Sequence, residues 1–440
     1  MTLNEPQLTD PTLFRQQVCI DGRWQDADSG ATLAVHNPAN GALLGTAPLC
    51  GTAETQRAIA AAARALPAWR ALTAGARARI LRRWFDLVLA HQEDLARLMT
   101  LEQGKPLAEA RGEIAYAASF IEWFSEEARR VYGDTIPGHQ SDKRILVIKQ
   151  PIGVTAAITP WNFPSAMLTR KAAPALAAGC AMVVKPASQT PFSALALVEL
   201  AQRAGVPAGV LNIVTGSAAQ IGAELTGNPL VRKLSFTGST EVGRQLMAQC
   251  AKDIKKVSLE LGGNAPFIVF DDADLEAAVQ GALVSKFRNN GQTCVCANRI
   301  YVQEGIYEAF ALRFREAVSQ LRVGDGLEEG VSLGPLIDAS ALAKVEEHIA
   351  DAVRLGARVT LGGTAHARGG NFFEPTVLVD VPQSALLVRE ETFGPVAPLL
   401  RFHGEADVIA MANDTEFGLA SYLYSRDIGR RSEEHTSELQ

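Results

Sequence analysis

From Gly153 onward the chain repeats one pattern, in which short uninterrupted apolar runs alternate with longer stretches rich in alanine and leucine. The apolar runs are residues 154–158, 181–184, 211–214 and 233–236. Runs of this length predict strands buried on both faces, as in a parallel sheet covered by helices such as the one predicted over residues 191–203. The pattern therefore predicts a doubly wound nucleotide-binding domain, whose ligand lies at the carboxyl ends of the strands.

Other parts of the chain also combine helical and strand-like patterns. Residues 18–130 begin with short strand-like pieces and continue with helical periodicity. After residue 262, predicted strands at 266–270 and 299–302 enclose a predicted helix at 274–288. The fold class that follows is α/β, with a second α/β domain beside the doubly wound one.

Composition excludes several classes of protein. The chain has 440 residues, of which 47% are hydrophobic and 20% are charged, which suits a globular protein with more than one core. A net charge of −6 without basic runs argues against a nucleic-acid partner or an anionic membrane surface. The uncharged stretch 150–169 contains three prolines and cannot span a membrane as a helix. Residues 1–11 hold no signal peptide and the six cysteines form no disulfide framework, so we expect a cytoplasmic protein.

The common nucleotide and metal motifs are missing. Gly324-Asp325-Gly326 does not continue as the G-x-G-x-x-G fingerprint, and no Walker loop is present. The only close pair of cysteines is Cys294 and Cys296, so we expect no metal site. A dinucleotide must then be held in another way.

Two strand-to-helix turns are candidates for holding a pyrophosphate. Gly216 precedes a helix after the run 211–214, and Ser239 follows the run 233–236 in Phe236-Thr237-Gly238-Ser239-Thr240. Free N–H groups and the positive end of a helix dipole would suit an anion at either turn. The alternative is that the serine only caps its helix.

Four other residues could carry chemistry. Lys185 ends an apolar strand, where a doubly wound sheet presents groups to its ligand, or it is simply solvated. Cys294 is a candidate nucleophile or a small core residue, and Glu260 a candidate base or an ion-paired carboxylate. Asn162 lies in a loop framed by Pro160 and Pro164, where its amide could hold an oxyanion or cap a turn.

Six segments in a fixed order together resemble the aldehyde dehydrogenase superfamily. They are residues 159–164, 184–191, 236–243, 259–263, 291–294 and 391–395. The resemblance implies that Cys294 attacks an aldehyde as a thiolate, forming a thiohemiacetal that becomes a thioester after hydride transfer. It also implies that Asn162 stabilises the oxyanion and that Glu260 activates the hydrolytic water. The residues it implies for cofactor binding are Trp161, Lys185, Ser188, Gly216, Ser239, Glu391 and Phe393.

The resemblance also indicates which cofactor and substrate to expect. Many NAD-preferring members have a glutamate at the position of Ser188; here Lys185 and Ser188 suit the 2′-phosphate of NADP, so we expect NADP, with NAD possible. Arg170 and Arg288 flank catalytic motifs and could bind a substrate carboxylate. Their surroundings look like the succinate-semialdehyde dehydrogenase branch. Glutarate semialdehyde, one methylene longer, remains the alternative substrate.

The remaining expectations concern regulation, assembly and domain bounds. Cys296 is a packing residue or a redox partner of Cys294. The dinucleotide-binding domain is predicted at 1–130 and 151–260, an oligomerisation element at 131–150, and the catalytic domain at 261–430. The resemblance implies a homodimer or homotetramer when full length, with a C-terminal partner strand that we do not find. Residues 431–440 read as a non-native tail. A truncated, inactive dinucleotide-binding remnant is the rival to an enzyme.

Overall fold

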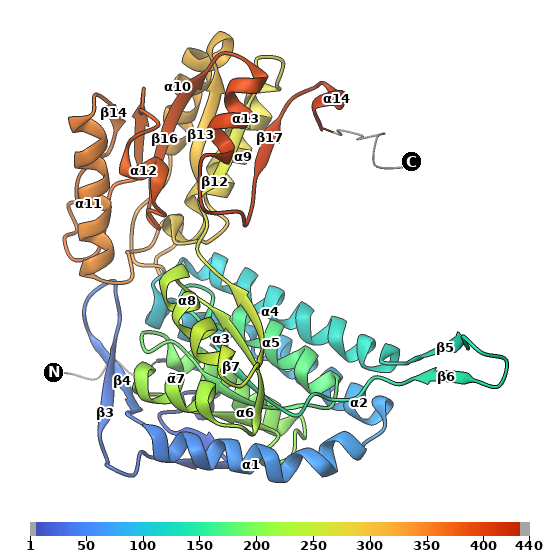
Figure 1. The fold of residues 1–440 in the computed structure, drawn as a ribbon. Helices are drawn as coiled ribbons and strands as arrows, with labels where there is room; N and C mark the ends of the chain where they lie inside the picture. Colours follow the sequence, from blue (N-terminus) through green and yellow to red (C-terminus); the bar gives the residue numbers. More distant parts are fainter. Residues whose placement is uncertain (1–5, 432–440) are drawn as a thin grey trace. The chain divides into compact units, whose positions relative to one another are not determined.

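The computed structural model of the protein describes residues 6–431, which divide into two compact units. Of these residues, unit 1 holds those up to Asn37, Gly41–Gln103 and Leu107–Glu260. Unit 2 holds Pro38–Asn40, Gly104–Pro106 and the residues from Leu261 onward. Each unit has its own sheet and its own buried apolar core (Figure 1).

The main sheet of unit 1 has seven strands in the order β11-β10-β7-β8-β9-β1-β2. Their bounds are β1 Val18–Ile20, β2 Arg23–Gln25, β7 Val154–Ile158, β8 Ala181–Lys185, β9 Leu211–Ile213, β10 Val231–Thr237 and β11 Lys256–Glu260. The five strands from β11 to β9 are parallel, whereas β1 and β2 are antiparallel. From β7 the chain adds β8 and β9 on one side and later β10 and β11 on the other. The predicted doubly wound sheet is therefore confirmed, with its switch point between β7 and β10.

Helices cover both faces of this sheet. Their bounds are η1 Pro11–Leu13, α1 Thr52–Ala71, α2 Ala74–Ala90, α3 Gln92–Gln103, α4 Leu107–Glu127, η2 Ala128–Arg130, α5 Pro164–Ala177, α6 Pro191–Arg203, α7 Ala218–Gly227 and α8 Thr240–Ala251. Because parallel crossovers are right-handed, α5 and α6 lie on one face and α7 and α8 on the other. Helix α6 is buried on nearly all sides, which explains why its sequence is apolar throughout. The helix predicted over 191–203 is confirmed.

Two hairpins complete unit 1, β3 Thr32–His36 with β4 Leu43–Pro48 and β5 Asp134–Pro137 with β6 Arg144–Val147. The β5–β6 hairpin extends away from the rest of the unit (Figure 1). Its aliphatic side chains face solvent, and Leu146 and the adjoining Ile148 are 74% and 64% exposed. A strand pair with exposed apolar side chains and open edges is a surface suited to pairing with another chain.

The sheet of unit 2 has six strands in the order β14-β15-β16-β13-β12-β17, all parallel except β14. The bounds are β12 Ala265–Val269, β13 Ala297–Gln303, β14 Arg358–Leu361, β15 Thr376–Val379, β16 Val396–Phe402 and β17 Tyr422–Tyr424. The helices are α9 Leu275–Phe287, η3 Arg288–Gly291, α10 Glu304–Val318, α11 Ala339–Arg354, α12 Leu386–Arg389, α13 Glu405–Asn413 and α14 Ile428–Arg431. Asp274 caps α9 by accepting the N–H of Ala277, so the predicted helix at 274–288 starts where its capping residue indicates.

Within residues 6–431, no helix is both long enough and apolar enough to cross a bilayer. The predicted non-native tail, residues 431–440, lies outside the described residues except for Arg431, the last residue of α14.

Candidate active site

The carboxyl ends of the parallel strands in unit 1 lie level with one another. Ile158 pairs in register with Lys185 on one side and with Phe236 on the other, and Thr237 pairs with Glu260. The last residues of these strands and the segments that directly follow them carry the unit 1 residues predicted to act on substrate or cofactor. The turns after β7 and β10 flank the switch point, which is where doubly wound sheets bind ligands.

Asn162 is buried in the loop between β7 and α5, as expected for an immobilised amide. The start of α5 is fixed by Glu113 of α4, whose Oε1 atom accepts the N–H groups of Ser165 (3.0 Å) and Ala166 (3.2 Å). Trp161 is half-buried in the same loop, and its carbonyl accepts a long hydrogen bond from Thr190. The buried carboxylate therefore holds the helix that begins directly after Asn162.

Lys185 is buried at the end of β8, and its Nζ donates to the carbonyl of Pro186 at 2.9 Å. Burial lowers the pKa of this amine to about 8. Ser188 is half-buried three residues later. The helix after this loop, α6, begins on a second buried carboxylate: Glu102 of α3 accepts the N–H groups of Phe192 and Ser193, both at 2.8 Å.

Substitution of Glu102 should show how much its contact with the first turn of α6 contributes to the free energy of unfolding. Burial raises the pKa of Glu102 to about 8, although the N–H groups that it accepts act in the opposite direction. The folded state then holds a proton that the unfolded state has lost, so this carboxyl's contribution to the free energy of unfolding falls as the pH rises from about 4.5 to about 8. In Glu102→Gln an amide N–H faces a backbone N–H, and we expect a loss of about 1–3 kcal/mol at pH near 5.

Urea unfolding at several pH values measures this effect. The pH slope between about 5 and 8 should be smaller in Glu102→Gln than in the native protein. Glu126→Gln, at an exposed position of α4, should match the native protein. Equal stability and equal slope in Glu102→Gln would contradict the assignment.

The turn after β10 leads into α8, whose first helical residue is Thr240. Ser239 is exposed, and its Oγ accepts the N–H of Val242 at 3.4 Å, so this serine caps α8 while its side chain stays exposed to solvent. The other predicted turn contains Gly216 in the left-handed region (φ 129°). A Cβ atom there would lie 2.3 Å from the carbonyl oxygen of Cys50, so the close approach of a neighbouring segment requires this glycine.

These groups fit a dinucleotide in their chemistry. A helix start with an exposed hydroxyl offers N–H donors and a positive dipole end to a pyrophosphate. Lys185 and Ser188 offer a cation and a hydroxyl group, and no carboxylate occupies position 188 to repel a phosphate.

Glu260 is half-buried and lines a cavity of 490 Å³ beside α5. Lys171 lines the same cavity, and its Nζ donates to Thr237 Oγ1 at 2.7 Å. Burial lowers the pKa of Lys171 to about 8; the charge of Arg170 lowers it further, whereas that of Glu260 raises it. Sequence analysis missed Lys171, although a lysine within the alanine-rich buried face of a helix was a usable signal.

Arg170 also lines this cavity. Its Nη1 lies 3.8 Å from the sulfur of Met167, and its guanidinium carbon lies 5.4 Å from the ring centre of Phe120. Among the described residues, no carboxylate forms an ion pair with Arg170. Its positive charge is therefore not neutralised by a carboxylate from these residues.

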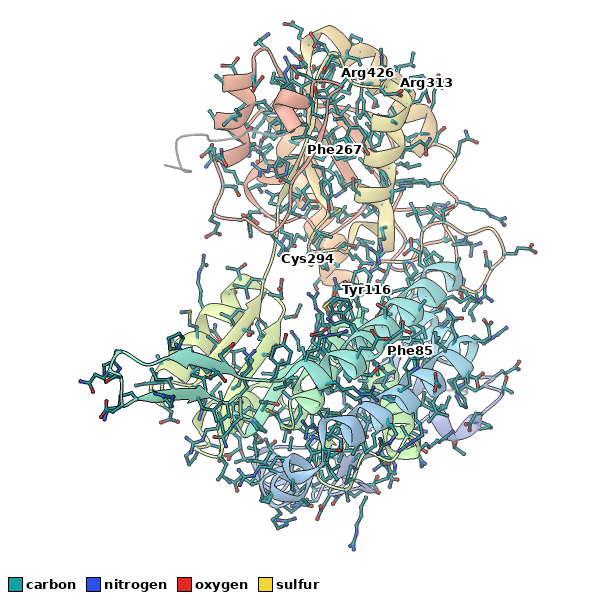
Figure 2. The ribbon with its side chains drawn as sticks, turned by 90° about the vertical axis from the view of Figure 1, so that its right-hand side faces the viewer. Phe85, Tyr116, Phe267, Cys294, Arg313 and Arg426 are labelled. Atoms are coloured by element: carbon teal, nitrogen blue, oxygen red, sulfur yellow. The ribbon has the colours of Figure 1, made fainter. Side chains whose placement is uncertain are left out.

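In unit 2 the candidate residues lie at the amino ends of the strands. Cys294 is half-buried in the loop before β13, at one end of the unit, while Phe267 of β12 lies inside it (Figure 2). The turn before Cys294 is left-handed at Asn289, Asn290 and Gly291, with φ of 51°, 57° and 74°. Asparagine and glycine tolerate this conformation better than other residues, so the sequence Asn-Asn-Gly suits it.

Side-chain contacts hold the turn in place. Asn290 donates to the carbonyl of Gly334 at 2.9 Å, and Gln292 accepts the N–H of Ile337 at 2.9 Å. A Cβ atom at Gly291 would lie 2.1 Å from the carbonyl oxygen of Gly394. The loop that carries Cys294 is thus packed directly against the segment before β16.

That segment contains Glu391 and Phe393. Burial raises the pKa of Glu391 to about 7, while the N–H of Gly263, which donates to Oε1 at 3.1 Å, acts to lower it. Phe393 has a φ of 56°, which is unusual for a bulky residue and stores backbone strain of about 1–3 kcal/mol.

The other two predicted residues of unit 2 differ in exposure. Arg288 is exposed at the end of α9, six residues before Cys294. Cys296 is fully buried; its Sγ contacts the carbonyl of Lys286 at 3.1 Å, and burial raises its thiol pKa. Tyr422, which sequence analysis missed, donates to the carbonyl of Val295 at 2.7 Å, and no local pattern around it signals this contact.

Three features define the class of protein. They are the strand order of the two sheets, the candidate residues at the carboxyl ends of the unit 1 strands and at the amino ends of the unit 2 strands, and the loop that carries Cys294. The sequence pattern of the aldehyde dehydrogenase family matches residues 24–437, and the chain belongs to this family.

Two relatives and one solved structure are similar over nearly the whole chain. The chain is 74% identical over 424 residues to the succinate-semialdehyde dehydrogenase [NADP(+)] GabD of Escherichia coli K12. It is 73% identical over 424 residues to the glutarate-semialdehyde dehydrogenase of Pseudomonas aeruginosa. Each alignment covers 96% of this chain and 88% of the relative. The crystal structure of an NADP-dependent enzyme from E. coli matches with a TM-score of 0.96 at 73% identity, over 96% of this chain and 88% of that one, which confirms the predicted fold class.

Proposed function

We propose that the protein oxidises succinate semialdehyde to succinate and reduces NADP. The observation that carries the substrate class is the positive charge of Arg170, which lines the cavity of Glu260 and has no carboxylate partner among the described residues. A guanidinium without a carboxylate partner can bind the carboxylate of an aldehyde acid. The names of the two relatives support an aldehyde acid of four or five carbons.

In the proposed mechanism the thiolate of Cys294 attacks the aldehyde carbon, so a C–S bond forms and the carbonyl oxygen becomes an oxyanion. Asn162 and the N–H of Cys294 donate to that oxygen. NADP, when bound, supplies the acceptor for the hydride that leaves the thiohemiacetal carbon. Glu260 then takes a proton from the water that attacks the thioester, and cleavage of the C–S bond releases the acid and the thiolate.

The residues proposed to hold the cofactor are those that the family resemblance implies. Lys185 and Ser188 would contact the 2′-phosphate side of the adenosine ribose, and Ser239 the pyrophosphate. Trp161, Gly216, Glu391 and Phe393 would complete the site. The names of one relative and one solved structure support NADP.

We further propose that the protein forms a homodimer or homotetramer through residues 131–150. The support is the β5–β6 hairpin, which presents Ile136, Leu146 and Ile148 to solvent. Burial of these side chains by a second copy would remove apolar surface from water.

Steady-state rates with three aldehydes and two cofactors test the activity. Succinate semialdehyde with NADP should give the highest kcat/KM, and butanal, which has four carbons but no carboxylate, a value at least about 10-fold lower. Glutarate semialdehyde should fall below succinate semialdehyde by about 10- to 200-fold if the pocket discriminates one methylene. Equal values for butanal would overturn the substrate class, and a higher kcat/KM with NAD would overturn the cofactor.

A further inference from the structure

Arg170 contacts α4 through an aromatic ring and not through a carboxylate. Several arginines in unit 1 are paired with a carboxylate, as Arg57 is with Asp28. Arg170 instead lies over the ring of Phe120 and next to the sulfur of Met167. An aromatic face attracts a guanidinium without neutralising its charge, and a guanidinium stacked on a ring keeps its in-plane N–H groups available for a ligand.

Phe120 has other neighbours besides Arg170. Its ring centre lies 4.7 Å from that of Tyr116, one turn earlier on α4. It also packs against the small apolar cluster of Ala117, Phe163, Ala166 and Met167. Phe163 directly follows Asn162, so the ring of Phe120 packs against the cluster that contains the neighbour of the candidate oxyanion donor and also contacts the guanidinium of Arg170.

The position of Phe120 on α4 explains why its ring can contact Arg170 of α5. Glu113 and Phe120 are seven residues apart, or about two turns, and so lie on the same face of the helix. Glu113 fixes the first turn of α5 at Ser165 and Ala166, and Phe120 contacts Arg170 further along α5. One face of α4 thus fixes both the start of α5 and its charged side chain.

We propose that Phe120 is a positioning residue that determines specificity for aldehyde acids, because its ring orients Arg170 toward the substrate carboxylate. This inference rests on the proposed function. An arginine that is ordered before the substrate arrives loses less side-chain freedom on binding. This smaller loss of side-chain freedom strengthens binding only for substrates that carry a carboxylate.

The test compares KM values for succinate semialdehyde and butanal. In Phe120→Leu the ratio of the KM for succinate semialdehyde to that for butanal should rise about 3- to 30-fold, with kcat for succinate semialdehyde within about 3-fold of the native value. Phe120→Tyr keeps the aromatic face and should restore the native ratio. Trp123→Leu removes an exposed aromatic ring of the same helix and should leave the ratio unchanged.

Arg170→Leu separates this inference from the function on which it rests. If Arg170→Leu leaves the ratio of the two KM values unchanged, the carboxylate site is wrong, and the proposed function fails with it. If Arg170→Leu raises the ratio but Phe120→Leu does not, or raises both KM values equally, only the role of Phe120 is overturned. When Arg170 is already leucine, adding Phe120→Leu should not change the ratio further.

Discussion

The Cys294→Ala variant should lose aldehyde oxidation, with kcat falling by at least about 10⁴-fold. The proposed reaction runs through a covalent bond to this sulfur. The neighbouring thiol of Cys296 cannot replace it, because Cys296 is fully buried with its Sγ against the carbonyl of Lys286. The rate is measured as the appearance of reduced NADP after addition of succinate semialdehyde. Mass spectrometry of the native protein, quenched during turnover, should find the acyl group on Cys294.

Cys296→Ala is the matched control, since it removes a thiol two residues away. It should keep kcat within a few-fold of the native value and should lose only packing. Retained oxidation in Cys294→Ala, or an acyl group found on Cys296 in the native protein, would refute the assignment of the nucleophile.

The Glu260→Gln variant should acylate normally and then stall. The side-chain amide of this variant cannot take a proton from water, so hydrolysis of the thioester should slow by about 10²- to 10⁴-fold. Rapid-mixing measurements should then show a burst of reduced NADP close to one equivalent per active site, followed by a slow steady state. Because Glu260 lies at the end of β11 in register with Thr237, the substitution should leave the strand pairing intact.

Glu276→Gln serves as the control for this substitution, because Glu276 is a surface carboxylate that pairs with Arg313. It should show native turnover. A Glu260→Gln variant with undiminished steady-state turnover, or with a slow first turnover and no burst, would contradict a role in hydrolysis.

The sequence predicted the parts of the fold that depend on local pattern. The apolar run at 154–158 became β7, and the alanine- and leucine-rich stretch at 191–203 became α6, because each had the length and composition of its element. The helix predicted at 274–288 became α9, which Asp274 caps. The loop that carries Cys294 was also predicted from one short segment, residues 291–294.

The features missed depend on which surfaces pack together. Glu113 contacts α5 from a helix 52 residues earlier, and Phe120 contacts Arg170 across the same pair of helices. Glu113 gave a usable signal, since it lies on the buried stripe of α4 with Ile114 and Ala117. The positive φ of Phe393 gave none, because phenylalanine has no preference for that conformation.

The two buried glutamates, Glu102 and Glu113, bear on the order in which parts of the nascent chain can pack together. Helices α3 and α4 emerge before the segments whose first turns they hold, so the N–H groups that bind Glu113 are synthesised only with residues 165 and 166, and those that bind Glu102 only with residues 192 and 193. Until then each carboxylate remains hydrated, because burying it without a partner is costly. The contacts of Glu113 with α5 and of Glu102 with α6 can therefore form only after the first turn of each of these helices has been synthesised.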